Sequence, residues 1–258
     1  LLQEVLDIFG KPSRRILQRL LPTAKEDVQL ELESLLSPER RDKWNELMSE
    51  TPTIAYLLRR FQLRPSLAEL ADAVPLIKPR LYSIASSQRL HPHVIQLCIV
   101  VVDWVTPSGR QRVGLCTNYV QKMKAGQRIV VSIRPSGFQR PPNHTAPLVM
   151  SALGTGIAPF RAFIQERKAA LEAGKTLGPA LFFFGCRYSK QDYLYADELE
   201  EALASGVITG LFPAFSRDGE KKVYIQNLIS ENAALVYRLL TVEGGFFYLC
   251  GPSNNVPE

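Results

Sequence analysis

The sequence lacks most features of disulfide-stabilised, metal-stabilised or membrane-spanning proteins. Its 258 residues include four cysteines, Cys98, Cys116, Cys186 and Cys250, and none of them forms a CxxC pair. Neither a zinc site nor a disulfide scaffold is therefore indicated, and free thiols in a reducing compartment such as the cytoplasm are expected. The longest apolar runs, near residues 97–102 and 180–184, are far shorter than the about 20 residues that a spanning helix needs.

The sequence also lacks an arginine-rich tract, internal repeats and low-complexity segments. Lys plus Arg is 31 and Asp plus Glu is 25, so the net charge is +6, but the basic residues are scattered. A nucleic-acid-binding protein would need a clustered basic face. Hydrophobic residues make up 46% and charged residues 22%, as in ordinary globular proteins. The length fits one large domain or two small ones.

The first 73 residues are expected to be helical. Apolar residues recur at helical spacing at positions 30, 32, 35 and 36, and again at 54, 57, 58 and 61. Ser37 followed by Pro38, and Thr51 followed by Pro52, are typical of helix starts. Residues 66–73 are expected to form a third short helix. From residue 79 the pattern changes, and β-rich runs at 97–102 and 127–133 predict strands of a barrel or antiparallel sheet.

Apolar runs alternate with helical stretches in the last third of the sequence. The runs cover residues 148–153, 180–184, 211–215 and 246–250, and helices are expected over 159–173, 196–204 and 223–240. Strands that alternate with helices predict βαβ units and a parallel sheet. The expected fold class is thus mixed, α+β followed by α/β, with a domain boundary close to Asn143.

The ends of these four runs carry residues suited to binding an anion. They are Gly154-Thr155-Gly156, Cys186-Arg187, Ser216-Arg217 and Cys250-Gly251. Ligands of open α/β sheets bind beyond the carboxyl ends of the strands, and glycines allow the backbone to approach a phosphate closely. A second anionic pocket is expected at Arg217, Lys221, Lys222 and Tyr224. One diphosphate and one separate phosphate are what NADPH presents.

Each of these residues also has an ordinary structural interpretation. A GxG after a strand often only makes a tight turn, and Arg217 and Lys222 alone are typical of solvated surface charges. Cys250 in an apolar strand is typical of an inert core thiol. Arg80, Tyr82 and Ser83 open a predicted β segment, where an edge strand with an exposed arginine is the simplest interpretation. The order of the four strand ends favours a binding site.

Taken together, the motifs resemble the NADPH-dependent diflavin reductases, which contain a ferredoxin-NADP reductase-like module. This family includes cytochrome P450 reductase, the sulfite reductase flavoprotein and the reductase part of pyruvate:NADP oxidoreductase. The motifs, in the family's order, are RLYSIASS (80–87), GLCT (114–117), GTGIAPFRAFIQER (154–167), FFGCR (183–187), AFSRD (214–218), KVYIQ (222–226) and YLCGP (248–252). The resemblance covers nearly the whole chain, and VDWVTPSG (102–109) is most similar to the sulfite and pyruvate enzymes.

The resemblance implies an FAD-binding antiparallel β-barrel with a helical connecting insert, followed by a Rossmann-like NADP domain. The implied bounds are 1–75 for the connecting region, 76–143 for the partial barrel and 144–258 for the NADP domain. In the FAD site, Arg80 would pair with the diphosphate, Tyr82 would stack on the flavin ring, and Ser83 would act near its reactive nitrogen. The implied lining also includes Leu81, Cys98, Val100 and Trp104, and Gly114, Leu115, Cys116 and Thr117 would hold the diphosphate.

The same resemblance implies roles in the NADP(H) site. Gly154, Thr155 and Arg187 would hold the diphosphate, and Cys250 would lie beside the nicotinamide as a catalytic residue together with Ser83. Ser216, Arg217, Lys222, Tyr224 and Gln226 would bind the adenosine end, the first four around the 2′-phosphate.

The implied activity is that of an oxidoreductase module for electron transport. Hydride would move from NADPH to FAD, and electrons would pass to FMN in a flavodoxin-like partner domain and then to a further acceptor. The alternative is a non-catalytic nucleotide-binding or scaffolding domain, because Pro252 stands where the family usually has an acid. The sequence begins with Leu1, shows no signal-peptide pattern, and stops before the acidic residue and terminal aromatic of the family. We therefore expect it to be a piece of a longer protein.

Overall fold

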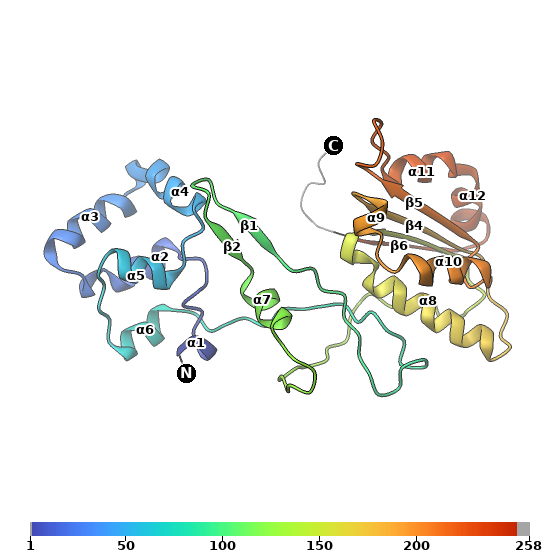
Figure 1. Cartoon of the computed structure of the whole chain (residues 1–258), viewed down its shortest axis with the longest axis horizontal. Coiled ribbons are helices and arrows are strands. Elements are labelled where there is room, and N and C mark those ends of the chain that lie inside the picture. Colours follow the sequence, from blue (N-terminus) through green and yellow to red (C-terminus); the bar gives the residue numbers. More distant parts are fainter. Residues whose placement is uncertain (1, 252–258) are drawn as a thin grey trace. The chain divides into compact units, whose positions relative to one another are not determined.

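The computed structural model describes residues 2–251, and the chain forms two compact units (Figure 1). One unit combines Leu1–Leu81 with Val101–Gln127, and the other combines Tyr82–Val100 with Arg128–Glu258. The segment 76–143, expected as one FAD-binding domain, thus contributes to both units. Pro252 lies outside the described residues. No helix in the described part of the chain is long and apolar enough to cross a bilayer.

The first unit begins with short helices. They are α1 (Leu2–Val5), α2 (Arg14–Leu20), η1 (Leu21–Thr23), α3 (Glu26–Leu36), η2 (Pro38–Arg40), α4 (Arg41–Ser49), α5 (Ile54–Arg60) and α6 (Leu67–Ala73). Ser66 caps α6 in a reciprocal capping box with Glu69, as the expected helix over 66–73 requires. The expected start at Thr51 is wrong, because Thr53 is the residue whose hydroxyl accepts from the first turn of α5. Ser37 precedes the 3₁₀ turn η2, which leads directly into α4.

The helices of this unit enclose their own apolar core. Leu17, Leu20, Leu32 and Leu57 have no exposed surface, and residues 54, 57 and 61 of the expected α5 face are all buried. Each fully buried leucine contributes about 1.5–3 kcal/mol relative to an exposed one. The helical part is therefore held by its own packing.

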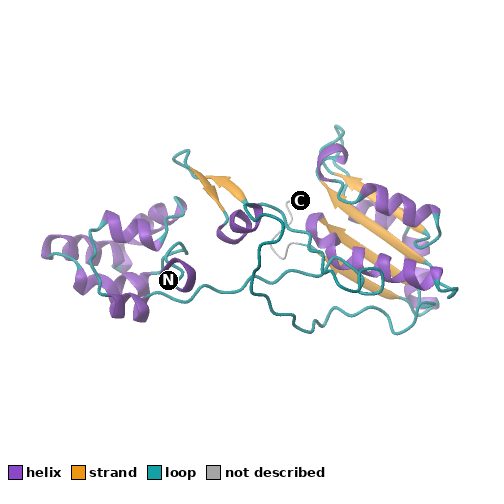
Figure 2. Cartoon of the chain, turned by 60° about the horizontal axis from the view of Figure 1, so that its bottom comes forward, coloured by secondary structure: helices purple, strands orange, loops and turns teal. Residues whose placement is uncertain are grey.

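The β-rich part of the sequence forms fewer strands than expected. A two-stranded antiparallel hairpin, β1 (Asp103–Val105) and β2 (Gln111–Val113), leads into α7 (Leu115–Gln121). The runs 97–102 and 127–133 are not assigned as strands, nor is 80–83, and Figure 2 draws them as loop. In the described chain these runs form no ladder. The bridge between Ile84 and Leu97 and the hydrogen bond from the Gly114 amide to the Val102 carbonyl are isolated contacts. Their apolar side chains stay largely exposed, and Val130 is fully accessible.

The second unit contains the expected parallel sheet. Its strands are β3 (Leu148–Leu153), β4 (Ala180–Cys186), β5 (Gly210–Phe215) and β6 (Phe246–Cys250), in the order β5-β4-β3-β6. The connecting elements are η3 (Gly154–Gly156), α8 (Ile157–Glu172), α9 (Ser189–Asp192), α10 (Ala196–Ala204), α11 (Ile225–Glu231), α12 (Ala233–Tyr237) and the π-helical turn η4 (Arg238–Val242). All strand pairs of this sheet are parallel, as the alternating pattern predicts.

Helices cover both faces of this sheet (Figure 1). On one face, Met150 and Phe182 pack with Phe160 of α8 and the buried residues of α10. On the other face, Val149 and Phe183 pack with α11, α12 and η4. Two expected helices differ from the structure. Helix α8 begins at residue 157 and not at 159, since Pro is tolerated in a first turn. The stretch 223–240 is broken at Asn232 into separate pieces.

Candidate nucleotide-binding site

The carboxyl ends of the four parallel strands meet at one edge of the sheet. Phe215 lies opposite Cys186, and Cys250 lies opposite Ala152. The pairing continues past β4 and β5, because the Ser216 amide donates to the Cys186 carbonyl at 3.0 Å and the Arg217 amide donates to the Arg187 carbonyl at 2.9 Å. The structure thus places Arg187 and Arg217 side by side, beyond the strands.

The glycine-rich turn follows β3 at the centre of this edge. Gly154 has φ +52°, and a Cβ built there would meet no atom within 4 Å. At Gly156 a Cβ would lie 2.2 Å from the Cys250 carbonyl oxygen. The first glycine therefore supplies a left-handed backbone beside open space, and the second allows close contact with the end of β6.

This turn leads directly into helix α8, whose first amides have no side-chain cap. The first turn of α8 contains no acidic residue. The Ile157 amide bonds within the turn and Pro159 has no N–H, so the positive end of the helix dipole is what favours an anion at this point. Half-buried Thr155 lies within the turn and adds a hydroxyl.

Exposed cations lie around the same edge. Arg187, Arg217 and Lys222 are exposed, and no ion pair among the described residues involves them. Half-buried Ser216 precedes Arg217. Uncompensated cations beside an open glycine turn fit the separate phosphates of NADP(H).

Tyr224 and Gln226 lie at the start of α11. The Tyr224 amide donates to Asn227 Oδ1 at 2.9 Å, which caps the helix. The Tyr224 ring is half-buried, whereas the side chain of Gln226 is exposed. This cap fixes the backbone of Tyr224, which lies two positions after Lys222. An aromatic ring near a cation suits stacking on a base that lies beside a phosphate.

The two thiols at this edge are protonated at neutral pH. Burial raises the pKa of Cys186 to about 11, and burial also raises the pKa of Cys250. The Cys250 side chain packs against the core of the α8 face of the sheet, while its carbonyl contacts Gly156. A protonated, half-buried thiol is a small polarizable contact surface and not a nucleophile.

The residues expected to bind FAD divide between the two units. Arg80, Leu81, Trp104 and the 114–117 motif belong to the first unit, and Tyr82, Ser83, Cys98 and Val100 belong to the second. The structure therefore describes two half-sites, each within its own unit.

In the first half-site, Gly114 precedes α7 as its N-cap residue. Buried Thr117 accepts from the Val102 amide at 3.1 Å. Its hydroxyl thus fixes the local backbone, a role that the motif did not reveal. Arg80 donates to the Lys78 carbonyl, and the Trp104 indole donates to Thr51 at 3.2 Å.

The remaining side chains of the two half-sites offer exposed surface for a planar ring. In the first unit Leu81 is 77% exposed and Leu115 is also exposed, whereas Cys116 is half-buried. In the second unit Ser83 and Val100 are exposed, Tyr82 is half-buried, and Cys98 contacts Tyr195. Within the second unit, Tyr82 and Val100 offer aromatic and apolar surface of the kind that a planar ring needs. Within the first unit, Arg80 and the turn at Gly114 offer groups suited to a phosphate.

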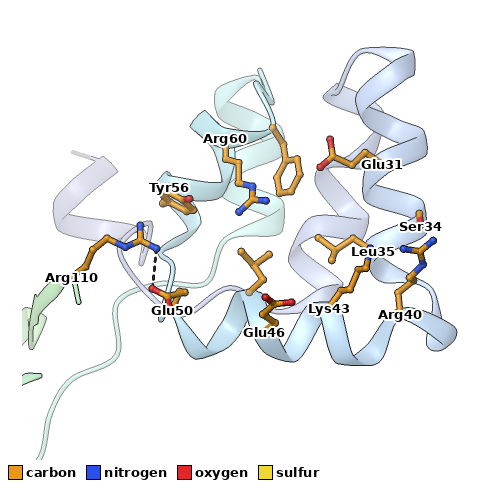
Figure 3. Close-up of a pocket in the computed structure, with 12 residues that line it drawn as sticks. Glu31, Ser34, Leu35, Arg40, Lys43, Glu46, Glu50, Tyr56, Arg60 and Arg110 are labelled. Atoms are coloured by element: carbon orange, nitrogen blue, oxygen red, sulfur yellow. Dashed lines mark hydrogen bonds and ion pairs between the residues drawn. The ribbon is translucent and has the colours of Figure 1, made fainter. Parts of the chain in front are cut away.

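A separate cavity of about 480 Å³ lies in the helical part of the first unit (Figure 3). Leu35, Leu47 and Phe61 contribute its apolar lining, and Figure 3 shows Arg110 reaching Glu50, with an ion pair of 3.1 Å. Tyr56 accepts from the guanidinium groups of Arg110 and Arg60, which lowers its pKa. The lining holds four cations, at 40, 43, 60 and 110, and three carboxylates, at 31, 46 and 50. Such mixed charge does not match a polyphosphate.

Two family models match the chain. The FAD binding domain matches residues 1–119, and the oxidoreductase NAD-binding domain matches residues 150–255. Among similar proteins, the sulfite reductase [NADPH] flavoprotein component of Saccharomyces cerevisiae is 40% identical over 99% of this chain and 25% of its own length. NADPH–cytochrome P450 reductase of Drosophila melanogaster is 36% identical over 99% of this chain and 39% of its own length. The pyruvate dehydrogenase [NADP(+)] of Cryptosporidium parvum is 36% identical over 96% of this chain and 14% of its own length.

These matches confirm the resemblance to the diflavin reductase family. The chain is an FAD- and NADP-binding reductase module, as the motifs predict, and its relatives are NADPH-dependent oxidoreductases. The expected order of a small antiparallel part and a parallel NADP-binding part is confirmed. The module spans well under half the length of each of these three relatives.

Proposed function

We propose that this diflavin reductase module oxidises NADPH and passes the electrons, one at a time, to an FMN-containing flavodoxin-like domain. Bound FAD would supply the chemistry that links the two, because it accepts a hydride and releases single electrons. The polypeptide's part is to bind, orient and exclude water. The proposed functional division is residues 1–75 for the connecting region, 76–143 for FAD and 144–258 for NADP(H).

The observation that carries this proposal is the arrangement at the carboxyl edge of the sheet. The open Gly154 turn and the α8 amino end lie at β3, and Arg187 and Arg217 are joined by the extended backbone pairing past β4 and β5. These groups would hold the diphosphate and the 2′-phosphate of NADPH. Cys250, which contacts the turn through its carbonyl, would present its thiol to the nicotinamide.

The proposed FAD roles rest on the two half-sites. Arg80 and the 114–117 motif would hold the diphosphate, and Tyr82 would stack on the flavin with Ser83 at its reactive edge. A further acceptor would then take the electrons from FMN. The proposed location is cytoplasmic, because none of the four cysteines forms a CxxC pair and the sequence indicates no disulfide scaffold.

Arg217→Ala tests the choice of nucleotide. Loss of a charged hydrogen-bonding group should weaken NADPH binding by about 1.5–3 kcal/mol, while NADH binding stays unchanged. Lys175→Ala is the matched control, because Lys175 is an exposed cation that precedes β4 at the opposite edge of the sheet. Equal losses for NADPH and NADH would contradict the 2′-phosphate assignment.

The wild-type holoprotein is used to distinguish a reductase from a non-catalytic scaffolding domain. The purified holoprotein should be yellow, and anaerobic NADPH should bleach its flavin band. A protein that binds FAD and 2′,5′-ADP but is not bleached would favour the non-catalytic alternative.

A further inference from the structure

Helix α8 holds the segment 84–98, which follows Tyr82 and Ser83. The side chains that hold it have no role in the nucleotide-binding site described above. We propose that Arg161, supported by Gln165 and Glu166, is a positioning residue that fixes Tyr82 and Ser83 relative to the NADP(H) turn. This proposal rests on the proposed function. All the residues concerned belong to the second compact unit.

Arg161 uses its whole guanidinium to hold this segment. Its Nη1 donates to the Ala85 carbonyl at 2.7 Å and to Gln96 Oε1 at 2.5 Å. Its Nε and Nη2 donate to the two carboxylate oxygens of Glu198, each at 2.8 Å. The planar group also lies over the Tyr195 ring, 4.5 Å from its centroid. The side chain is only 11% exposed, so its orientation is fixed from several sides.

A second contact lies one helical turn further along α8. Gln165 Oε1 accepts from the Ser87 amide at 2.9 Å, and Glu166 accepts from the Ser87 hydroxyl at 2.5 Å. Glu166 also forms an ion pair of 2.8 Å with Arg89. Residues four apart lie on the same side of a helix, so Arg161 and Gln165 hold the segment from one face of α8.

The segment has local hydrogen bonds of its own. The Ala85 amide donates to the Gln96 carbonyl at 2.8 Å, and the Gln96 amide donates to the Ser86 hydroxyl at 3.0 Å. It can therefore keep its shape when Arg161 is removed and shift as a body against α8. Loss of Arg161 should consequently move Tyr82 and Ser83, which precede Ala85 by three and two positions, without unfolding the segment.

The geometry links this anchor to the nucleotide turn. The Gly154–Gly156 turn leads directly into α8, and Arg161 lies little more than one turn into that helix. A rigid helix thus connects the proposed diphosphate turn with the proposed flavin-facing residues. A displacement of about 1 Å between reacting groups can lower a rate about 100-fold. Arg161 therefore sets the geometry for hydride transfer without touching either nucleotide.

The test compares Arg161→Met and Arg161→Lys with the matched variant Lys168→Met. Lys168 also bridges α8 to α10, and its ion pair, at 2.6 Å, is with Glu201 and not with the segment 84–98. In stopped-flow experiments with the holoprotein, Arg161→Met should slow flavin reduction by about 10- to 100-fold. Arg161→Lys should recover part of the rate, and Lys168→Met should match the wild type. The affinity for 2′,5′-ADP and the flavin content should change by less than about twofold, because Arg161 touches neither ligand.

Amide hydrogen exchange supplies a readout that does not depend on activity. Exchange of the Ser87 amide, which donates to Gln165 of α8, should become faster in Arg161→Met and stay unchanged in Lys168→Met. A wild-type reduction rate or unchanged exchange in Arg161→Met would overturn the proposal. Loss of 2′,5′-ADP binding or of flavin would equally overturn it, because Arg161 would then be a general structural residue. If NADPH fails to bleach the wild type, the proposed function fails and the catalytic role of this anchor falls with it.

Discussion

Gly156 is the position at which the sheet edge tolerates little change, and Gly156→Ala tests this directly. The residue has ordinary backbone angles, with φ −60°, so alanine introduces no strain by itself. The added methyl group would lie 2.2 Å from the Cys250 carbonyl oxygen and 2.7 Å from its carbonyl carbon. Both atoms belong to the backbone at the end of β6, so no side-chain rotation can make room.

The size of the effect follows from this contact. Normal van der Waals separation requires the turn and β6 to move apart by about 1 Å, and overpacking of this kind costs about 1–3 kcal/mol. A cost at the upper end is expected, because Cys250 is in register with Ala152 of β3. Alanine also lowers the entropy of the unfolded chain, which offsets up to about 1 kcal/mol, so the expected net loss is about 2 kcal/mol.

Alanine substitutions at two other glycines serve as controls, because they introduce backbone strain without a steric clash. Gly154 and Gly174 both have positive φ, +52° and +74°, and a Cβ at either position would meet no atom within 4 Å. Alanine at either should cost about 1 kcal/mol through strain alone. Only Gly154 lies in the proposed diphosphate turn, so Gly154→Ala should weaken NADP⁺ binding and Gly174→Ala should not.

Native-state hydrogen exchange of the β3 and β6 amides is the appropriate measurement. Both tryptophans, Trp44 and Trp104, belong to the other compact unit, so their fluorescence does not report on this sheet. Gly156→Ala should lower the opening free energy more than either control. Wild-type protection of β6 in Gly156→Ala would refute the reasoning about close approach.

Three further predictions follow from other contacts. Arg167 is buried and donates to the carbonyls of residues 144, 178 and 207, so Arg167→Met should destabilise the second unit by about 3 kcal/mol, and a loss below about 0.5 kcal/mol in hydrogen exchange would contradict it. Tyr82→Ala should weaken flavin binding by about 0.5–1.5 kcal/mol through the loss of ring stacking, and Arg80→Ala should weaken it further; full yellow colour in both variants would exclude these FAD roles. Hydrogen bonding to Ser108 holds the pKa of Glu50 at about 2, below its usual 4.5, so its stabilisation of the β1–β2 hairpin should be complete above about pH 4.5 and disappear as the pH falls towards 2. The stability of the hairpin is followed as Trp104 fluorescence against pH. Glu50→Gln should abolish the pH dependence of this signal, and an unchanged profile would show that Glu50 is not its source.

The NADP-binding part could be predicted from the sequence because its signals are local. Each strand is a short apolar run that ends at a turn residue, and α10 spans the predicted residues 196–204. Helix starts are harder to place, since Thr51 and Thr53 both offer a capping hydroxyl and only the structure shows that Thr53 is used. Local propensity cannot decide between two such neighbours.

The β-rich part could not be predicted in the same way. A strand needs a hydrogen-bonded partner along its length, and in the described chain the run 97–102 has the bridge at Leu97 and one backbone hydrogen bond, from Gly114 to Val102. The role of Thr117 is also hidden in the sequence, because its acceptor role towards Val102 depends on a contact across 15 residues. Arg161 lies 65 positions from Gln96, and nothing in the spacing of the motifs marks that pair.

The motif at residues 154–167 is continuous because one helix serves three sites in succession. Its first residues form the turn at the carboxyl edge of the sheet, and Arg161 and Gln165 hold the segment that follows Tyr82 and Ser83. Arg167 then binds carbonyls at 144, 178 and 207, just before β3, β4 and β5 begin at the opposite edge. At 1.5 Å per residue the 16-residue helix is about 24 Å long, enough to reach from one edge of the sheet to the other. A change at Arg167 should therefore act on stability, whereas a change at Arg161 should act on rate, although the two residues are less than two turns apart.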